Sequence, residues 1–146
     1  MKFLTTLILS GLVATFAAAQ AAETPVLEPI PAADVALADL LWLRRPIVVF
    51  ADSPSDPAFQ TQLRYLAEDP GELIKRDVVI LTDTDPKTLS EAREKLRPRG
   101  FSIVLLDKDG KLMLRKPLPW SVREIVHAID KFPLRQQEIR DQQSSR

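Results

Sequence analysis

The sequence contains no cysteine among its 146 residues. Disulfide exchange and cysteine-dependent peroxidase activity both need a thiolate as nucleophile, so this chain supplies neither chemistry. The disulfides that staple many small exported domains are excluded too, and a folded domain must depend on its hydrophobic core. Because His127 is the only histidine, the usual nitrogen and sulfur ligands of zinc are too few. We expect no cofactor.

Charge is almost absent from the first 21 residues. Met1-Lys2 gives a positive start, Phe3–Ala19 is apolar or small, and Ala19-Gln20-Ala21 has the small-x-small spacing of a signal-peptidase site. A membrane-spanning helix needs about 20 apolar residues, and this run is slightly shorter and is interrupted by hydroxyl side chains. The pattern predicts a signal peptide over residues 1–21 and a periplasmic or secreted protein. No cysteine follows it, which excludes a lipid-anchored protein.

An excess of either charge sign is also lacking. Lys2 is the only one of the 20 basic residues within 1–21, so the remainder carries 19 basic residues against 20 acidic ones. A general nucleic-acid binder needs a basic excess to contact phosphates, and an electrostatic membrane binder needs one to contact anionic lipid. We therefore expect no nucleic-acid partner and no stable membrane association after signal cleavage.

Hydrophobic patterning predicts one α/β domain. Continuous apolar runs rich in β-branched residues are typical of strands buried on both faces, and apolar residues at helical spacing predict helices between them. Asp56-Pro57 and the capping box of Thr88 with Glu91 are helix-start signals. The predicted order is β-α-β-α-β-β-α, a mixed four-stranded sheet flanked by helices, with strands at 47–51, 78–81, 103–106 and 111–116.

Three segments follow the predicted signal peptide. Residues 22–45 begin with a stretch rich in proline and alanine, which predicts a flexible lead-in, and continue as a short helix capped by Asp34. Residues 46–132 hold the strands and helices of the predicted core. Residues 133–146 predict a polar C-terminal helix whose tail frays.

Two segments of this pattern are similar to thioredoxins. Thioredoxins carry a C-G-P-C motif after their first core strand, and Ser55-Asp56-Pro57-Ala58 occupies that place here, with Ser55 and Ala58 instead of the cysteines. They also carry R-G-I-P-T before a later strand, where this chain has Arg99-Gly100-Phe101-Ser102-Ile103, with Ser102 instead of the cis proline. The resemblance implies a thioredoxin-like fold from which both halves of the redox site are missing.

A longer set of segments resembles the DUDES-type thioredoxin-like domain of unknown function, whose bacterial branch consists of short exported proteins. The similarity spans about residues 40–140, and its ordered segments are Arg45–Ala51, Lys75–Val79, Arg99–Gly110 and Phe132–Gln136. The resemblance implies the fold and an exported compartment. It implies no catalytic residues, and we assign none.

A partner-binding groove is the leading functional hypothesis. In redox-active relatives the two corresponding loops hold a substrate peptide, and loss of the cysteines need not remove that surface. We expect an unknown envelope protein or peptide as partner. An unpaired backbone edge at Ser102 would accept a strand from it. The candidate groove residues are Asp52, Ser55, Asp56, Pro57, Arg99, Phe101 and Ser102.

Carboxylates that follow two neighbouring strands support an alternative function. Asp52, Asp56, Asp83 and Asp85 would meet at one edge of the sheet, where open α/β sheets bind ligands, and oxygen ligands suit divalent ions. The alternative is therefore a divalent-ion-binding protein or a hydrolase. These four residues equally suit helix caps and turns. A purely structural envelope component remains a third possibility.

Two further features are weaker candidates. Arg93, Lys95, Arg97 and Arg99 form a basic cluster, which is typical of a solvated helix face and is otherwise a partner-binding surface. His127 is predicted to lie on the solvated face of its helix, opposite the apolar stripe. A Ser-His-Asp site would need His127 beside Ser53 or Ser55, which the expected fold does not favour.

Overall fold

The computed structural model describes residues 24–146, so the predicted signal peptide lies outside the described residues. A five-stranded mixed sheet forms the centre, in the order β1-β3-β2-β4-β5. β1, β3 and β2 run parallel to one another, and β4 and β5 are antiparallel to their neighbours. The strands are β1 (Ile30–Pro31), β2 (Arg45–Phe50), β3 (Val78–Asp83), β4 (Ser102–Leu106) and β5 (Leu112–Lys116).

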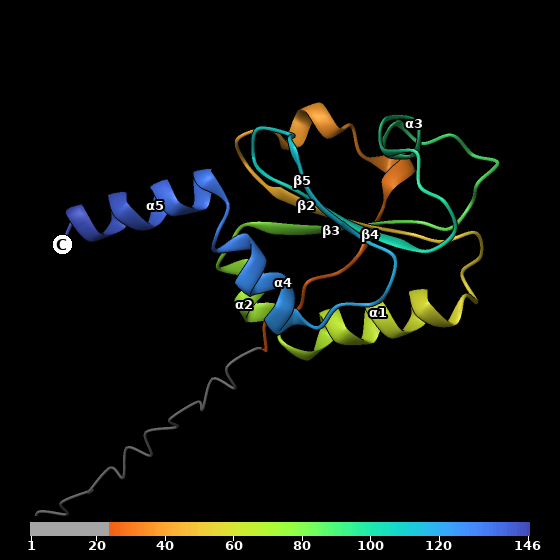
Figure 1. The fold of residues 1–146 in the computed structure, drawn as a ribbon, viewed down its shortest axis with the longest axis horizontal. Coiled ribbons are helices and arrows are strands. Elements are labelled where there is room, and N and C mark those ends of the chain that lie inside the picture. Colours follow the sequence, from red (N-terminus) through yellow and green to blue (C-terminus); the bar gives the residue numbers. More distant parts are fainter. Residues whose placement is uncertain (1–23) are drawn as a thin grey trace, which may run out of the picture.

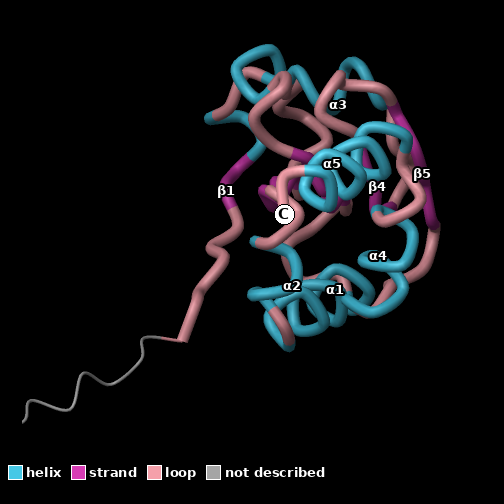
Figure 2. The backbone as a smooth tube through the Cα atoms, turned by 90° about the vertical axis from the view of Figure 1, so that its left-hand side faces the viewer, coloured by secondary structure: helices cyan, strands magenta, loops and turns pink. Residues whose placement is uncertain are grey.

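Helices cover both faces of this sheet (Figure 1). The elements α1, α2 and α4 lie on one face, whereas α3 and two 3-10 turns lie on the other. Figure 2 shows β1 and β5 at opposite margins of the domain. The helices are α1 (Pro57–Glu68), α2 (Pro70–Ile74), α3 (Glu91–Leu96), α4 (Val122–Ile129) and α5 (Pro133–Ser144). None of the helices within 24–146 has the length and apolar character needed to cross a bilayer.

The predicted α/β architecture is confirmed, with one more strand than expected. Ile30 and Pro31, placed by sequence in the flexible lead-in, pair with Leu81 and Thr82 at the free edge of β3. The pairing is only two residues long, and a proline, which has no N–H to donate, is tolerated at such an edge. The predicted four-stranded sheet is therefore extended by a short fifth strand, which covers part of the outer edge of β3.

The predicted short helix over 34–43 is wrong. Two 3-10 turns replace it, Ala32–Asp34 and Leu37–Leu40, and Asp34 lies inside the first turn rather than at a cap. Between them the backbone returns to extended geometry, and Leu37 is buried against the sheet. Packing of isolated apolar residues has overridden helix propensity here.

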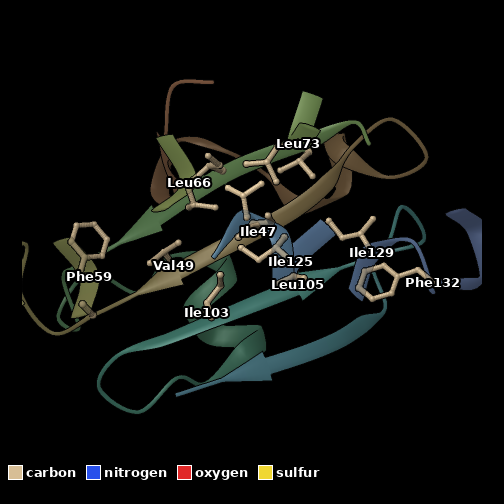
Figure 3. Close-up of a cluster of buried hydrophobic side chains, with 14 residues drawn as sticks. Ile47, Val49, Phe59, Leu66, Leu73, Ile103, Leu105, Ile125, Ile129 and Phe132 are labelled. Atoms are coloured by element: carbon tan, nitrogen blue, oxygen red, sulfur yellow. The ribbon is translucent and has the colours of Figure 1, made fainter. Parts of the chain in front are cut away.

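Alternation along β2 builds two cores from one strand. Ile47 and Val49 point into the layer of α1, α2 and α4, and Val48 and Phe50 point into the layer of α3. The larger core gathers side chains from the helices α1, α2 and α4 and from the strands β2, β3 and β4 (Figure 3). All six residues of β2 are buried, and the strand lies in the middle of the sheet, so it is the central strand of the domain.

Ion pairs connect α5 to the body of the domain. The helix has no buried residue of its own. Glu138 on α5 accepts hydrogen bonds from Arg45, which is 1% exposed, and forms an ion pair with Lys108. Arg45 also pairs with buried Asp107 at 3.0 Å between Nε and Oδ1. The C-terminal helix is thus held mainly by charge, since it contributes few apolar contacts.

Candidate functional site

The two loops of the predicted groove begin at the same end of the sheet. β2 and β4 are antiparallel, and Phe50 at the end of β2 stands opposite Ser102 at the start of β4. The loop 51–56 therefore leaves the sheet where the loop 97–101 enters it. This is the juxtaposition that the sequence predicts.

The loop after β2 is held by its own hydrogen bonds. Asp56 caps α1: its Oδ1 accepts from the Ala58 amide at 2.8 Å and from the Phe59 amide at 3.1 Å. The hydroxyl groups of Ser53 and Ser55 are 2.9 Å apart. Asp52, Ser55 and Pro57 are exposed. A carboxylate that already accepts two amides stabilises the helix and is poorly placed to bind a ligand.

A hollow of about 460 Å³ lies on the other side of the second loop. Its lining includes three of the seven predicted groove residues and none of the four from the loop 51–57. It is lined by Arg97, Arg99, Phe101, Ser102, Arg115 and Pro117. This hollow thus faces β5 instead of lying between the two loops.

Ser102 occupies an unusual position at the start of β4. The residue is 5% exposed, and within residues 24–146 its Oγ is the one buried side-chain oxygen or nitrogen that has no hydrogen-bond partner. β4 is an interior strand, flanked by β2 and β5, and the β5 ladder begins one residue later at Ile103 opposite Lys116. The expected free edge at Ser102 is therefore wrong, and the open edge on this side belongs to β5.

The four carboxylates of the alternative hypothesis do not gather into one site. Asp83 is buried and receives Arg93 Nη2 at 2.8 Å and the Ser90 hydroxyl at 2.6 Å. Asp85 closes a turn, where the Thr88 hydroxyl and the Lys87 amide hold its pKa below the ordinary value. Across the described part of the chain, no three residues of the metal-ligating types are grouped closely enough to hold an ion.

The basic cluster divides into a structural residue and a surface. Arg93 is buried: it pairs with Asp83, donates to the Ala51 carbonyl at 3.1 Å and lies 5.4 Å from the centre of the Phe50 ring. Lys95 pairs with Glu91 on the exposed face of α3. Arg97 and Arg99 are exposed and line the hollow. The prediction of a solvated basic face is wrong for Arg93.

Arg115 and Pro117 are site residues that sequence reasoning missed. Arg115 lies on β5, and its Nη2 donates to the Leu96 carbonyl at the end of α3. Pro117 follows the last residue of β5. Both residues reach the hollow because β5 pairs with β4. Their local sequence, a basic residue two positions before a proline, does not predict this position.

His127 lies on the exposed side of α4, as predicted. Together with residues of α1, α2 and α4, it lines a separate hollow of about 460 Å³ whose other members include Glu68, Asp69, Glu72 and Asp130. Ser53 and Ser55 are not among the residues of that hollow. Nothing in the geometry brings His127 to the serines of the first loop.

Solved structures share the fold at low sequence identity. The chain is similar to chloroplastic thioredoxin z, with a TM-score of 0.51, 24% identity, and coverage of 75% of this chain and 98% of that one. It is also similar to the reduced 2-Cys peroxiredoxin of Plasmodium vivax, with a TM-score of 0.54, 14% identity, and coverage of 66% and 81%. It is similar as well to Prx1a of Plasmodium yoelii, with a TM-score of 0.51, 18% identity, and coverage of 66% of this chain and 77% of that one.

No curated protein matches the sequence. A family model does match, over residues 36–138, and its description is a domain of unknown function, DUF4174. The match extends from the second 3-10 turn to the first half of α5, so it includes the whole sheet apart from β1. With its thioredoxin-like fold and its cysteine-free sequence, the chain belongs to the DUF4174 family.

Proposed function

We propose that this protein is an exported thioredoxin-like protein without redox activity that binds an envelope protein or peptide. One observation carries the proposal: the thioredoxin-like scaffold is retained while the chain contains no cysteine. Ser55 and Ser102 stand where redox-active relatives have a cysteine and the cis proline. A scaffold kept without its reactive groups is more consistent with binding than with catalysis.

The surface that remains at this end of the sheet supports a binding role. Phe101 is half-buried and packs against the larger core, so the loop before β4 has a fixed anchor. The adjoining hollow is open to solvent and is rimmed by exposed side chains. In chloroplastic thioredoxin z, the same fold serves a type-specific target recognition.

Export is supported by the pattern of residues 1–21 and by the family resemblance. A positive start, an apolar run and a small-x-small site are the three parts of a secretory signal. The proposal predicts that protein recovered from the periplasm or medium begins at Ala22. Intact-mass measurement of the recovered protein tests this, and a chain that still begins at Met1 would contradict it.

The carboxylate alternative has weaker support than partner binding. Asp56 caps α1, Asp85 closes a turn and Asp83 is neutralised by Arg93, so that Asp52 is the one member of the four left without such a structural role. Calorimetric titration with calcium and magnesium distinguishes the two functions. Binding of either ion that is lost in Asp52→Asn would favour the alternative. Self-association of the purified protein would favour a structural envelope component.

Site-specific photo-crosslinking in the intact cell envelope tests the proposal. The probe replaces Pro117, which is exposed and lines the hollow, and the matched control replaces His127, which is exposed on α4. Partner binding at this surface predicts one dominant adduct from position 117 that is absent from position 127. Equal adducts from both positions, or none from position 117, would count against it.

A further inference from the structure

The hollow beside β5 is lined by three arginines and by no acidic residue. Its six lining residues come from three segments: the end of α3 (Arg97), the loop before β4 (Arg99, Phe101 and Ser102) and the region around the end of β5 (Arg115 and Pro117). The fold, rather than a local run of sequence, therefore brings the three guanidinium groups to one concavity.

These arginines differ from the buried ones in their electrostatic environment. Arg45, Arg76 and Arg93 each form an ion pair with a carboxylate. Within residues 24–146, no acidic oxygen lies within ion-pair distance of the three guanidinium groups around the hollow. Three like charges facing one space repel one another, and an anion placed among them relieves this repulsion.

Local geometry positions two of the arginines. Arg115 is oriented by the hydrogen bond from its Nη2 to the Leu96 carbonyl. Arg97 ends α3 in the left-handed region, with φ 46° and ψ 59°, and its amide donates to the Arg93 carbonyl. Glycine is the usual residue at such a helix end, because a side chain makes the left-handed conformation unfavourable. Backbone conformation therefore does not explain why an arginine stands at this position.

The orphaned hydroxyl of Ser102 is an independent observation at the same place. Ser102 is one of the six lining residues, and its buried Oγ has no hydrogen-bond partner within the described residues. A serine hydroxyl donates one hydrogen bond, and rotation about χ1 moves the oxygen among three staggered positions. A buried donor without a partner is unfavourable, and an acceptor brought into the hollow by a ligand would satisfy it.

We infer that the hollow binds an oxyanion carried by a peptide, with the guanidinium groups of Arg97, Arg99 and Arg115 as its charged contacts and the Ser102 hydroxyl as an added donor. Guanidinium forks bind planar carboxylates in a bidentate way and bind phosphate oxygens equally well. That the anion is carried by a peptide rests on the proposed function, whereas the anion site itself does not. A nucleic-acid carrier is disfavoured because the chain as a whole has no basic excess.

Peptide titrations followed by amide NMR of the purified protein test the inference. The probes are a capped pentapeptide with two glutamates, its glutamine counterpart, and a counterpart with phosphoserine; inorganic phosphate is the fourth. The glutamate and phosphoserine peptides are expected to shift the amides of Phe101, Ser102 and Ile103, and binding should weaken as salt is raised. Shifts caused by phosphate and the phosphoserine peptide alone would assign the anion as phosphoryl rather than carboxylate, within the same site.

Matched variants distinguish a specific site from general attraction. R97Q/R99Q removes two of the three charged contacts, and R44Q/R140Q removes the same charge from exposed arginines outside the hollow. The first pair is expected to weaken binding at least about tenfold, and the second less than about twofold. Ser102→Ala is expected to weaken binding by about two- to tenfold without changing the charge.

Three results would overturn the inference: a glutamine peptide that binds as tightly as both the glutamate and the phosphoserine peptides, equal losses in the two arginine pairs, or amide shifts centred away from the loop before β4. The outcome is separable from that of the proposed function. A crosslinked partner at position 117 that is indifferent to R97Q refutes the anion site alone. Anion binding at Phe101–Ile103 with no crosslinked partner refutes the partner and leaves the site.

Discussion

Replacing Glu138 with glutamine tests whether the C-terminal helix is held by charge. Its Oε1 accepts from Arg45 Nη2 at 2.9 Å and pairs with Lys108 Nζ at 2.8 Å, and its Oε2 lies 3.2 Å from Arg135 Nη1. The glutamine has almost the same shape but no charge. The substitution therefore removes the electrostatic part of the contact and leaves its size unchanged.

The pKa of Glu138 sets the expected magnitude. Burial alone would raise it, but hydrogen bonds from Arg45 and Lys108 outweigh burial and lower the pKa from 4.5 to about 2. A pKa that is lower in the folded state means that the ionised form stabilises the fold. That contribution is complete above about pH 4.5 and is lost as the pH falls through about 2. It corresponds to about 3 kcal/mol, of which about half remains at pH 3.

Urea denaturation of the wild type and of Glu138→Gln, followed by circular dichroism at several pH values, measures this contribution. At pH 7 the substitution is expected to lower the free energy of unfolding by about 2–3 kcal/mol, since Arg45 keeps Asp107 as a partner. The difference should shrink to about half at pH 3. Glu68→Gln, on the exposed side of α1, is the control and should change stability by less than about 0.5 kcal/mol. A difference that is the same at pH 7 and pH 3 would refute the reasoning.

Three other substitutions have outcomes that follow from the contacts. Asp83→Asn leaves Arg93 buried without its counter-charge and should lower the free energy of unfolding by about 3–5 kcal/mol in urea denaturation. Gln62→Leu removes hydrogen bonds of 2.8 Å to both the amide and the carbonyl of Trp120, so a loss of about 2–4 kcal/mol and faster hydrogen exchange at the Trp120 amide are expected. Ser102→Ala removes an unpaired buried hydroxyl and should raise the free energy of unfolding by about 1 kcal/mol; a loss in thermal melting would mean that the hydroxyl has a partner.

The central strands were predictable because their signal is local. Ile47–Ala51 is apolar without interruption. A strand that is buried on both faces needs this composition, and β2 is such a strand because one hydrophobic core lies on each side of it. β1 was not predictable, because two residues have no periodicity and Pro31 argues against a strand. It exists because the edge of β3 is open to any nearby extended backbone.

The helix starts show the same division between local and long-range causes. Asp56 was predicted to cap α1, and its carboxylate accepts from the first amides of that helix. For α3 the predicted capping box of Thr88 with Glu91 is wrong. Ser90 is the N-cap, while Thr88 donates to Asp85. Several hydroxyl residues precede that helix, and only the position of Asp83 in the folded sheet determines which of them is drawn inward.

Site residues were less predictable than strands, because their neighbours are distant in sequence. Arg93 and Arg97 lie four residues apart, which on a regular helix predicts one shared face. Arg93 is instead buried, because Asp83 ends β3 beneath it, whereas Arg97 lies beyond the last helical residue, in a left-handed turn that redirects its side chain. Arg115 joins the same surface only through the β4–β5 hairpin.

The arginines of this fold form two groups, one buried in ion pairs that stabilise the fold and one exposed around the hollow. The buried guanidinium groups of Arg45 and Arg93 are neutralised by Asp107 and Asp83, and such pairs are sensitive to the loss of either partner. The guanidinium groups around the hollow have no such partners, so the free energy of folding depends little on them. It follows that stability and anion binding can be altered separately. Substitutions at Arg97 and Arg99 would change what the surface attracts, whereas substitutions in the buried pairs would destabilise the scaffold that presents it.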